Sequence, residues 1–291
     1  MLIFALKFFR AFFMINHNGD LIADDFILAT NRSFLYGDGV FETLKIVNSK
    51  ILFFESHYFR LMSSMRIMRM KIPMHFTMEF LEQEILQLAE ENATASSARV
   101  RITVYRNDGG YYTPTDATVS YVIQTTPLDT RDYVHAKTSF EVELYKDFYV
   151  GKQLLSTLKT TSKTIQVLAA VYAQENDYAS CLLLNESKNV VEGISGNLFM
   201  KLGNKLITPP LSEGCLNGIM RNQVIRLAKK IEGLEVVEEP ISPFDLQKAE
   251  ELFLTNVIQG IQSITNYRKK SFETTLATML VEQLNLDIQS N

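Results

Sequence analysis

The stretch Leu155-Ser-Thr-Leu-Lys159-Thr-Thr opens the segment that decides the fold, and Val-Val-Glu192-Gly-Ile-Ser-Gly-Asn197 closes it. Lys159 falls between a strand-like segment and a helical run, where a side chain can project from a fixed element into a cleft. Glu192 ends a later strand, and the glycines of the turn after it allow close backbone approach. A lysine and a glutamate in one cleft suit work on an aromatic cofactor, because the amine forms a Schiff base and the carboxylate pairs with a ring nitrogen. A solvated lysine and an ordinary turn would explain the same letters, so the surrounding residues decide.

The composition is that of a globular protein. The 291 residues can bury a sizeable core, as one large domain or two of moderate size. Hydrophobic and charged fractions of 46% and 21% are ordinary, and a net charge of −4 gives no sign of a nucleic-acid surface. Cys181 and Cys215 fit no metal spacing, so the sequence predicts no metal site and a reducing compartment.

Residues 1–13 are strongly apolar. They are too short to span a bilayer and are interrupted by Lys7 and Arg10. They also lack the basic start and small-residue cleavage site of a signal peptide. We therefore expect an apolar N-terminal extension on a cytoplasmic protein with no membrane partner.

The first half begins with a turn and a glycine-rich loop. Residues 14–22 form two short apolar runs around Asn18-Gly19, which predicts a hairpin. The stretch Tyr36-Gly-Asp-Gly-Val-Phe-Glu-Thr43 predicts a tight loop that feeds a strand, because two glycines bracket an aspartate before a β-rich run.

Two arginines of this half are candidates for binding anions. Arg60 lies in a predicted helix, and Arg106 ends a predicted strand before a Gly-Gly loop that contains Asn107 and Tyr111. A guanidinium suits this task because it offers a rigid fork of donors to phosphate or carboxylate oxygens. Each also has an ordinary alternative, namely an exposed helix charge for Arg60 and a solvated strand end for Arg106.

Turn residues near the middle divide the chain into two blocks. We expect a linker over 127–133, between a smaller α/β domain at 14–126 and a larger domain at 134–291. Both blocks mix strands and helices, which predicts an α+β protein of two domains. Because pockets favour domain interfaces, the site is expected in the cleft between them.

A glycine before a helix marks a second anion candidate. Gly218 leads into a helix predicted at 222–230. Free backbone N–H groups and the positive end of the helix dipole make such a start attractive to phosphate, although ordinary helix entries are commoner.

Together these motifs resemble the pyridoxal-phosphate enzymes of fold type IV, the class IV aminotransferases. The group includes branched-chain aminotransferases, D-amino acid aminotransferases and aminodeoxychorismate lyases, and the resemblance extends from about Met14 to Thr265. It implies a two-domain α+β fold with pyridoxal 5'-phosphate in the interdomain cleft. It also implies a homodimer with active sites near the dimer interface.

The resemblance assigns a role to each motif. Lys159 takes the position of the catalytic lysine that holds the cofactor, and Glu192 that of the glutamate facing the pyridine nitrogen. The remaining cofactor contacts, mostly at the phosphate, fall to Arg60, Gly218, Ile219, Met220, Thr255 and Asn256. Substrate contacts fall to Tyr36, Arg106, Asn107 and Tyr111.

Three activities compete within this family. An arginine-x-histidine trap typical of D-amino acid aminotransferases is missing, because Asn107 and Asp108 follow Arg106. Branched-chain aminotransferases usually carry a tyrosine five residues beyond the lysine, where this chain has Thr164. The arginine, Gly-Gly loop and aromatic resemble aminodeoxychorismate lyases, as does the helix start Asn-Gly-Ile-Met-Arg221.

We therefore predict a lyase that splits 4-amino-4-deoxychorismate into 4-aminobenzoate and pyruvate for folate synthesis. The alternative is a class IV aminotransferase that acts on branched-chain or D-amino acids with 2-oxoglutarate. A cofactor-binding family member without activity also stays open.

Overall fold

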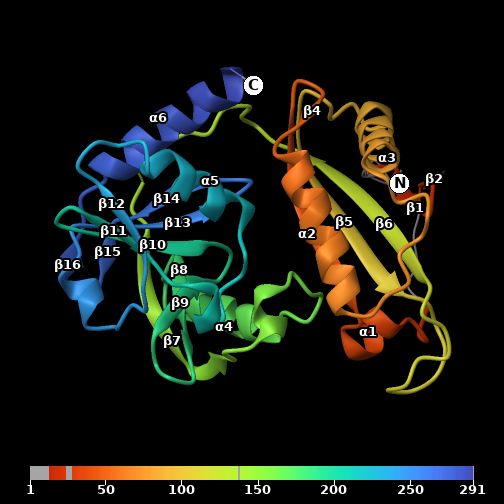
Figure 1. The fold of residues 1–291 in the computed structure, drawn as a ribbon, viewed down its shortest axis with the longest axis horizontal. Coiled ribbons are helices and arrows are strands. Elements are labelled where there is room, and N and C mark those ends of the chain that lie inside the picture. Colours follow the sequence, from red (N-terminus) through yellow and green to blue (C-terminus); the bar gives the residue numbers. More distant parts are fainter. Residues whose placement is uncertain (1–12, 24–27, 137, 291) are drawn as a thin grey trace, which may run out of the picture.

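The computed structural model describes residues 13–23, 28–136 and 138–290 (Figure 1). Except for Phe13, the predicted apolar extension lies outside the described residues. The rest forms two lobes, each built on a β-sheet, which confirms the predicted two-domain α+β fold. Among the described helices, none has the length and apolar character needed to cross a membrane.

The first lobe holds a six-stranded sheet in the order β2-β1-β6-β5-β3-β4, with every neighbouring pair antiparallel. Its strands are β1 (Ile15–His17), β2 (Asp20–Ile22), β3 (Gly39–Val47), β4 (Lys50–Ile51), β5 (Ser97–Arg106) and β6 (Val119–Pro127). Its helices are α1 (Arg32–Tyr36), α2 (Phe54–Ile67) and α3 (Met78–Glu91). The predicted hairpin is confirmed, with β1 and β2 on either side of Asn18-Gly19.

One face of this sheet is covered by α2 and α3. Met65 and Ile85 from the helices are fully buried against Leu44 of β3 and Val100 of β5. Along β5 the side chains alternate, so the even-numbered residues from 98 to 104 enter this core. The odd-numbered residues of β5 therefore point to the opposite face of the sheet.

The second lobe is built on a ten-stranded mixed sheet, in which β7–β8, β11–β12 and β7–β15 pair in parallel. Its strands are β7 (Glu141–Val150), β8 (Ser180–Asn185), β9 (Val190–Gly193), β10 (Asn197–Leu202), β11 (Lys205–Thr208), β12 (Glu235–Glu238), β13 (Glu251–Asn256), β14 (Gly260–Ile264), β15 (Asn266–Tyr267) and β16 (Lys270–Ser271). Its helices are α4 (Thr164–Glu175), α5 (Ile219–Ala228) and α6 (Thr275–Ser290), with short 3-10 turns η1 (Leu154–Thr157), η2 (Leu211–Glu213) and η3 (Asp245–Gln247).

Backbone contacts join the two lobes next to Lys159. The segment after η1 runs antiparallel to the start of β3, where Phe41 N donates to the Lys159 carbonyl at 2.8 Å. Thr161 N donates to the Gly39 carbonyl at 2.9 Å. Lys159 is thus fixed by the first lobe although it belongs to the second half of the sequence.

Candidate active site

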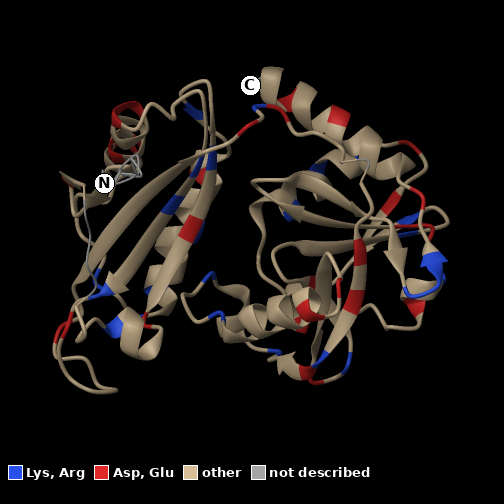
Figure 2. Cartoon of the chain, turned by 180° about the vertical axis from the view of Figure 1, so that it is seen from behind, with Lys and Arg blue, Asp and Glu red and all other residues tan. Residues whose placement is uncertain are grey.

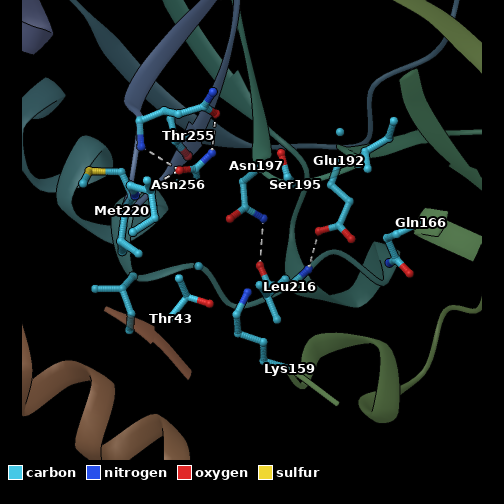
Figure 3. A pocket seen from close by; sticks show the side chains of 18 of the residues that line it. Thr43, Lys159, Gln166, Glu192, Ser195, Asn197, Leu216, Met220, Thr255 and Asn256 are labelled. Atoms are coloured by element: carbon cyan, nitrogen blue, oxygen red, sulfur yellow. Dashed lines mark hydrogen bonds between the residues drawn. The ribbon is translucent and has the colours of Figure 1, made fainter. Parts of the chain in front are cut away.

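A cavity of about 510 Å³ lies beside Lys159 and is bounded by residues from both halves of the chain. The first half contributes Phe41, Thr43, Arg60, Arg99 and Arg101. The second half contributes Lys159, Lys163, Gln166, Glu192, the turn after it, the start of α5 and residues 255–259. Figure 3 shows Lys159, Glu192 and Thr255 directed toward this common space.

The Lys159 side chain is half-buried and borders the cavity. Its Nζ lies 4.6 Å from the centroid of the Phe41 ring. Burial lowers the pKa of this amine to about 8 from 10.5, and the nearby Arg60 charge lowers it further than Glu42 raises it. The neutral, nucleophilic form of the amine is therefore far more populated near physiological pH than it is for an ordinary lysine, whose pKa is 10.5.

Glu192 is a buried carboxylate near the end of β9. Its Oε2 accepts a hydrogen bond from the backbone N–H of Leu216 at 2.9 Å. Burial raises the pKa of Glu192, while the Leu216 N–H and the Lys163 amine act in the opposite direction. A cationic partner such as a protonated ring nitrogen would stabilise the ionised carboxylate at this position.

Arg60 is oriented by a buried ion pair. Its Nε and Nη2 donate to the two oxygens of Glu42 at 2.7 and 2.6 Å, and His57 Nδ1 lies 2.7 Å from Glu42 Oε2. Arg60 Nη1 donates to the carbonyl of Asn217 at 2.7 Å, in the loop before α5. The bonds to Glu42 hold the guanidinium at the cavity, and the bond to Asn217 connects α2 to the loop before α5.

The start of α5 has the features of a phosphate site. Gly218 is the residue before the helix, which begins at Ile219 and not at the predicted residue 222. A Cβ on Gly218 would lie 1.9 Å from Asn197 Oδ1, so any other residue would have to displace the Asn197 side chain. The hydroxyl of Thr255, at the end of β13, is buried without a hydrogen-bond partner among the described residues. Free N–H groups of the first turn and an unsatisfied hydroxyl at one cavity suit an anion.

The side chain of Asn256 shapes the same end of the cavity. Its Oδ1 accepts hydrogen bonds from the backbone N–H groups of Ile258 and Gln259 at 3.0 and 2.8 Å. The turn after β13 is thereby fixed against the cavity that Met220 also borders.

The four residues expected to contact substrate do not border this cavity within the described chain. Arg106 is buried, and its guanidinium donates to Asp38 and to the carbonyls of Met68 and Arg69. All three guanidinium nitrogens thus have an acceptor inside the first lobe, and the expected substrate role of Arg106 stays a prediction. Asn107 bonds to Thr118 and Ser120, Tyr111 is exposed, and Tyr36 packs near Tyr112.

Three cationic side chains that were not predicted as site residues border the cavity. Arg99 and Arg101 project from β5 into the cavity, and Lys163 joins them from the start of α4. Lys and Arg positions recur along the strands of the first sheet (Figure 2). Strand alternation is the signal that could have found the two arginines, because their neighbours Ala98, Val100 and Ile102 are apolar.

The residues present fit pyridoxal phosphate. A neutral lysine amine suits its aldehyde, a buried carboxylate suits its ring nitrogen, and the α5 start with the Thr255 hydroxyl suits its phosphate. Lys159, Glu192, Arg60, Gly218 and Thr255 would hold the cofactor in this arrangement.

Comparison with known proteins agrees with this fit. The chain is 32% identical over 238 residues to a protein of Methanocaldococcus jannaschii described as a branched-chain-amino-acid aminotransferase, with 79% of each chain covered. It is 27% identical over 262 residues to aminodeoxychorismate lyase of Bacillus subtilis, with 86% of each covered. The branched-chain amino acid aminotransferase of Thermobaculum terrenum in its PLP form has the same fold, with a TM-score of 0.81 at 24% identity over 93% of this chain and 92% of that one. The model of the family described as amino-transferase class IV matches residues 39–267, so the chain belongs to this family of pyridoxal-phosphate enzymes.

Proposed function

We propose that the chain is an aminodeoxychorismate lyase, which releases 4-aminobenzoate and pyruvate. The supporting observation is the set of three cationic side chains beside Lys159. Arg99, Arg101 and Lys163 border the cavity, and none of them forms an ion pair with a carboxylate in the described part of the chain. Aminodeoxychorismate carries two carboxylates, which such a wall would bind.

The wall also has an aromatic component. The Arg101 guanidinium lies 3.7 Å from the Phe41 ring centroid, and its Nε donates to Thr103 Oγ1 at 3.1 Å. Arg101 is therefore fixed in direction while its outer nitrogens remain for an anion. Phe41 offers a ring face beside both Arg101 and Lys159, which suits a flat cyclic substrate. Arg60 differs from these cations because Glu42 already pairs with it.

The residues of this chain divide the work of the reaction. Bound pyridoxal phosphate supplies an electron sink for the carbon that carries the substrate amine. Lys159 would hold the cofactor, and its free amine would take the proton from that carbon. Glu192 keeps the ring nitrogen protonated, and Arg99 with Arg101 orients the carboxylates. Pyruvate leaves as the ring becomes aromatic.

An aminotransferase is the second candidate, favoured by the 32% identity to the Methanocaldococcus jannaschii protein. The cationic wall would then bind the second carboxylate of glutamate or 2-oxoglutarate. The two candidates differ in what happens to the cofactor, since a lyase leaves it in its starting form, whereas an aminotransferase given an amino acid alone transfers the amino group to the cofactor and leaves it changed until an oxo acid is added.

Incubation of holoenzyme with each substrate set tests the proposal. With aminodeoxychorismate we expect 4-aminobenzoate to accumulate while the absorbance of the bound cofactor persists. Loss of that absorbance with an amino acid, without aminobenzoate formation, would identify the aminotransferase instead. Lys159→Ala should abolish both the absorbance and turnover.

A matched pair of variants tests the cationic wall. Arg101→Gln should raise KM for aminodeoxychorismate by about tenfold or more, because a hydrogen bond to a charged group contributes about 1.5–3 kcal/mol. The control Arg66→Gln changes an exposed arginine of α2 and should leave KM as it is. Equal effects of both variants would contradict the role of Arg101.

The active form in this proposal is a homodimer. Support comes from α4, whose side chains Val167, Leu168 and Val171 are large, apolar and exposed in the single chain. Sedimentation over a range of concentrations measures the assembly, and a monomer that retains full activity would refute it.

A further inference from the structure

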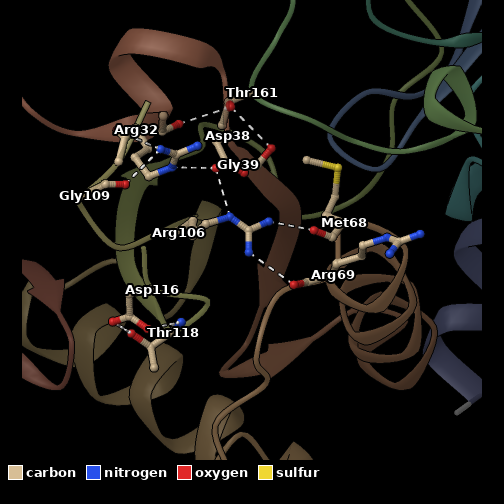
Figure 4. Close-up of polar contacts among 12 residues, drawn as sticks. Arg32, Asp38, Gly39, Met68, Arg69, Arg106, Gly109, Asp116, Thr118 and Thr161 are labelled. Carbon is tan, nitrogen blue, oxygen red and sulfur yellow. Dashed lines mark hydrogen bonds and ion pairs between the residues drawn. The ribbon is translucent and has the colours of Figure 1, made fainter. Parts of the chain in front are cut away.

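A single carboxylate on the first lobe is shared by two buried arginines (Figure 4). Asp38 Oδ2 accepts from Arg32 Nε and from Arg106 Nε, each at 2.9 Å. The three side chains are 12%, 4% and 8% exposed. Buried charges are tolerated where hydrogen bonds satisfy them, so the remaining guanidinium donors need further acceptors.

Those acceptors are backbone carbonyls of two neighbouring segments. Arg32 Nη1 donates to the carbonyls of Gly109, Gly110 and Tyr111 at 3.1, 3.3 and 2.6 Å. The other arginine, Arg106, donates to two carbonyls that follow α2. Gly110 has a φ of +71°, and a Cβ there would lie 2.1 Å from the Thr113 carbonyl oxygen. The loop after β5 is therefore tight, and Arg32 holds it through the carbonyls of residues 109–111.

The residue after Asp38 holds the Lys159 segment. The Gly39 carbonyl accepts from the N–H of Thr161 at 2.9 Å and from its hydroxyl at 3.3 Å. Ser33 Oγ, from α1, donates to Thr161 Oγ1 at 3.1 Å. The Asp38 side chain therefore binds the two arginines, and its neighbour Gly39 pairs with residues 159–161.

We infer that Asp38 is a positioning residue that holds the loop over residues 107–115 and the segment over 159–161 in one fixed relation. The carboxylate does not border the cofactor cavity, so its effect on the reaction passes through the backbone. The loop carries Tyr111 and Tyr112, which are 84% and 89% exposed, at its tip. The inference needs only the family's cofactor and is independent of whether the enzyme is a lyase or an aminotransferase.

Hydrogen exchange of the holoenzyme tests the coupling. Asp38→Asn keeps the size of the side chain but leaves one carbonyl oxygen and an NH₂ group for two arginine donors. We expect hydrogen exchange of the amides of 107–115 and of 159–161 to accelerate in both segments by about tenfold. Exchange in α3 and α6 should stay unchanged. Faster exchange in the loop alone would overturn the inference.

The control lies on the same lobe. Asp116 accepts from the N–H and the hydroxyl of Thr118, and Figure 4 shows that pair apart from the arginines. Asp116→Asn should alter exchange near 116–118 and leave 159–161 unchanged. If it accelerates 159–161 as strongly as Asp38→Asn does, the effect is general loosening and the inference fails.

A second readout follows the lysine itself. After removal of the cofactor, the Asp38→Asn protein should capture pyridoxal phosphate about tenfold more slowly than the unchanged protein. The reason is that a small misplacement of the Lys159 amine slows its reaction, and such misplacements cost up to about a hundredfold in rate. Asp38→Glu, which restores the charge, should recover part of the rate. If Asp38→Asn does not fold, Arg32→Lys keeps the buried charge and should accelerate exchange of residues 109–111. Unchanged exchange there, or an unchanged capture rate in folded Asp38→Asn, would refute the positioning role.

Discussion

Replacing Glu42 by glutamine removes the negative charge that Arg60 and His57 share. Arg60 contacts both carboxylate oxygens, and His57 Nδ1 contacts one of them. A glutamine at this position keeps one acceptor oxygen, but its NH₂ group would face donors of Arg60 or His57 that now have a carboxylate oxygen. Arg60 would then keep its charge beside a neutral amide at the wall of the cofactor cavity.

The size of the effect can be worked from the pKa of Glu42. Burial alone would raise this pKa, but Arg60 and then His57 lower it to about 2 from 4.5. At about 1.4 kcal/mol per pKa unit, the carboxylate contributes about 3 kcal/mol to the free energy of unfolding near neutral pH. Breaking a buried ion pair by removing one partner costs a similar amount, about 3–5 kcal/mol.

The sign of the pH dependence follows from the same values. Because the folded pKa lies below the unfolded one, the stabilisation is complete above about pH 4.5 and is lost as pH falls toward about 2. At about pH 3 it has fallen to about 1.4 kcal/mol. The difference between the unchanged protein and Glu42→Gln should therefore shrink by about half between about pH 7 and about pH 3.

Urea unfolding followed by far-UV circular dichroism measures this difference, since the chain has no tryptophan to report by fluorescence. The control Glu250→Gln removes a carboxylate that pairs with Lys201 and is 42% exposed, and its effect should be small at both pH values. A Glu42→Gln penalty that is equal at both pH values would mean that packing, not charge, holds this site together.

Lys159 should capture pyridoxal phosphate at a rate that rises with pH around a midpoint of about 8, because only the neutral amine attacks. The absorbance of cofactor-free protein mixed with pyridoxal phosphate measures this rate, and a midpoint near 10.5 would contradict the prediction. Gly218→Ala should weaken cofactor retention by about tenfold or more, because the added Cβ must displace the Asn197 side chain beside the α5 start. Equilibrium dialysis measures retention, and unchanged affinity would argue against a phosphate at that helix. Ile85→Ala should lower the free energy of unfolding by about 2–5 kcal/mol through a cavity in the first core, measured by urea unfolding, while folded protein keeps its cofactor absorbance.

The cofactor residues were predictable because their signals are local. Lys159 follows a turn, Glu192 lies near a strand end before a glycine turn, and Gly218 precedes a helix. Each position follows from the element that contains it, and a family resemblance then assigns its role. The structure places all three at one cavity, although their roles there stay predictions until the cofactor is bound to this chain.

The cationic side chains that β5 contributes to the cavity were harder to predict, because their position depends on which face of the strand meets the second lobe. Arg106 has the same parity along β5 as Val100 and Ile102, so it points toward the helix-covered face and meets the end of α2. Arg99 and Arg101 have the opposite parity and reach the cavity. Alternation alone separates the two sets, but only the packing of the lobes decides which set faces the ligand.

The site is assembled from groups that cross between the halves of the chain. Arg60 belongs to α2, yet it holds the Asn217 carbonyl in front of α5. Lys159 follows η1, yet its carbonyl accepts from Phe41 at the start of β3. A ligand that binds only the assembled site stabilises this arrangement by mass action. Cofactor binding and the contact between the two halves are therefore linked, and conditions that separate the lobes should release the cofactor before either core unfolds.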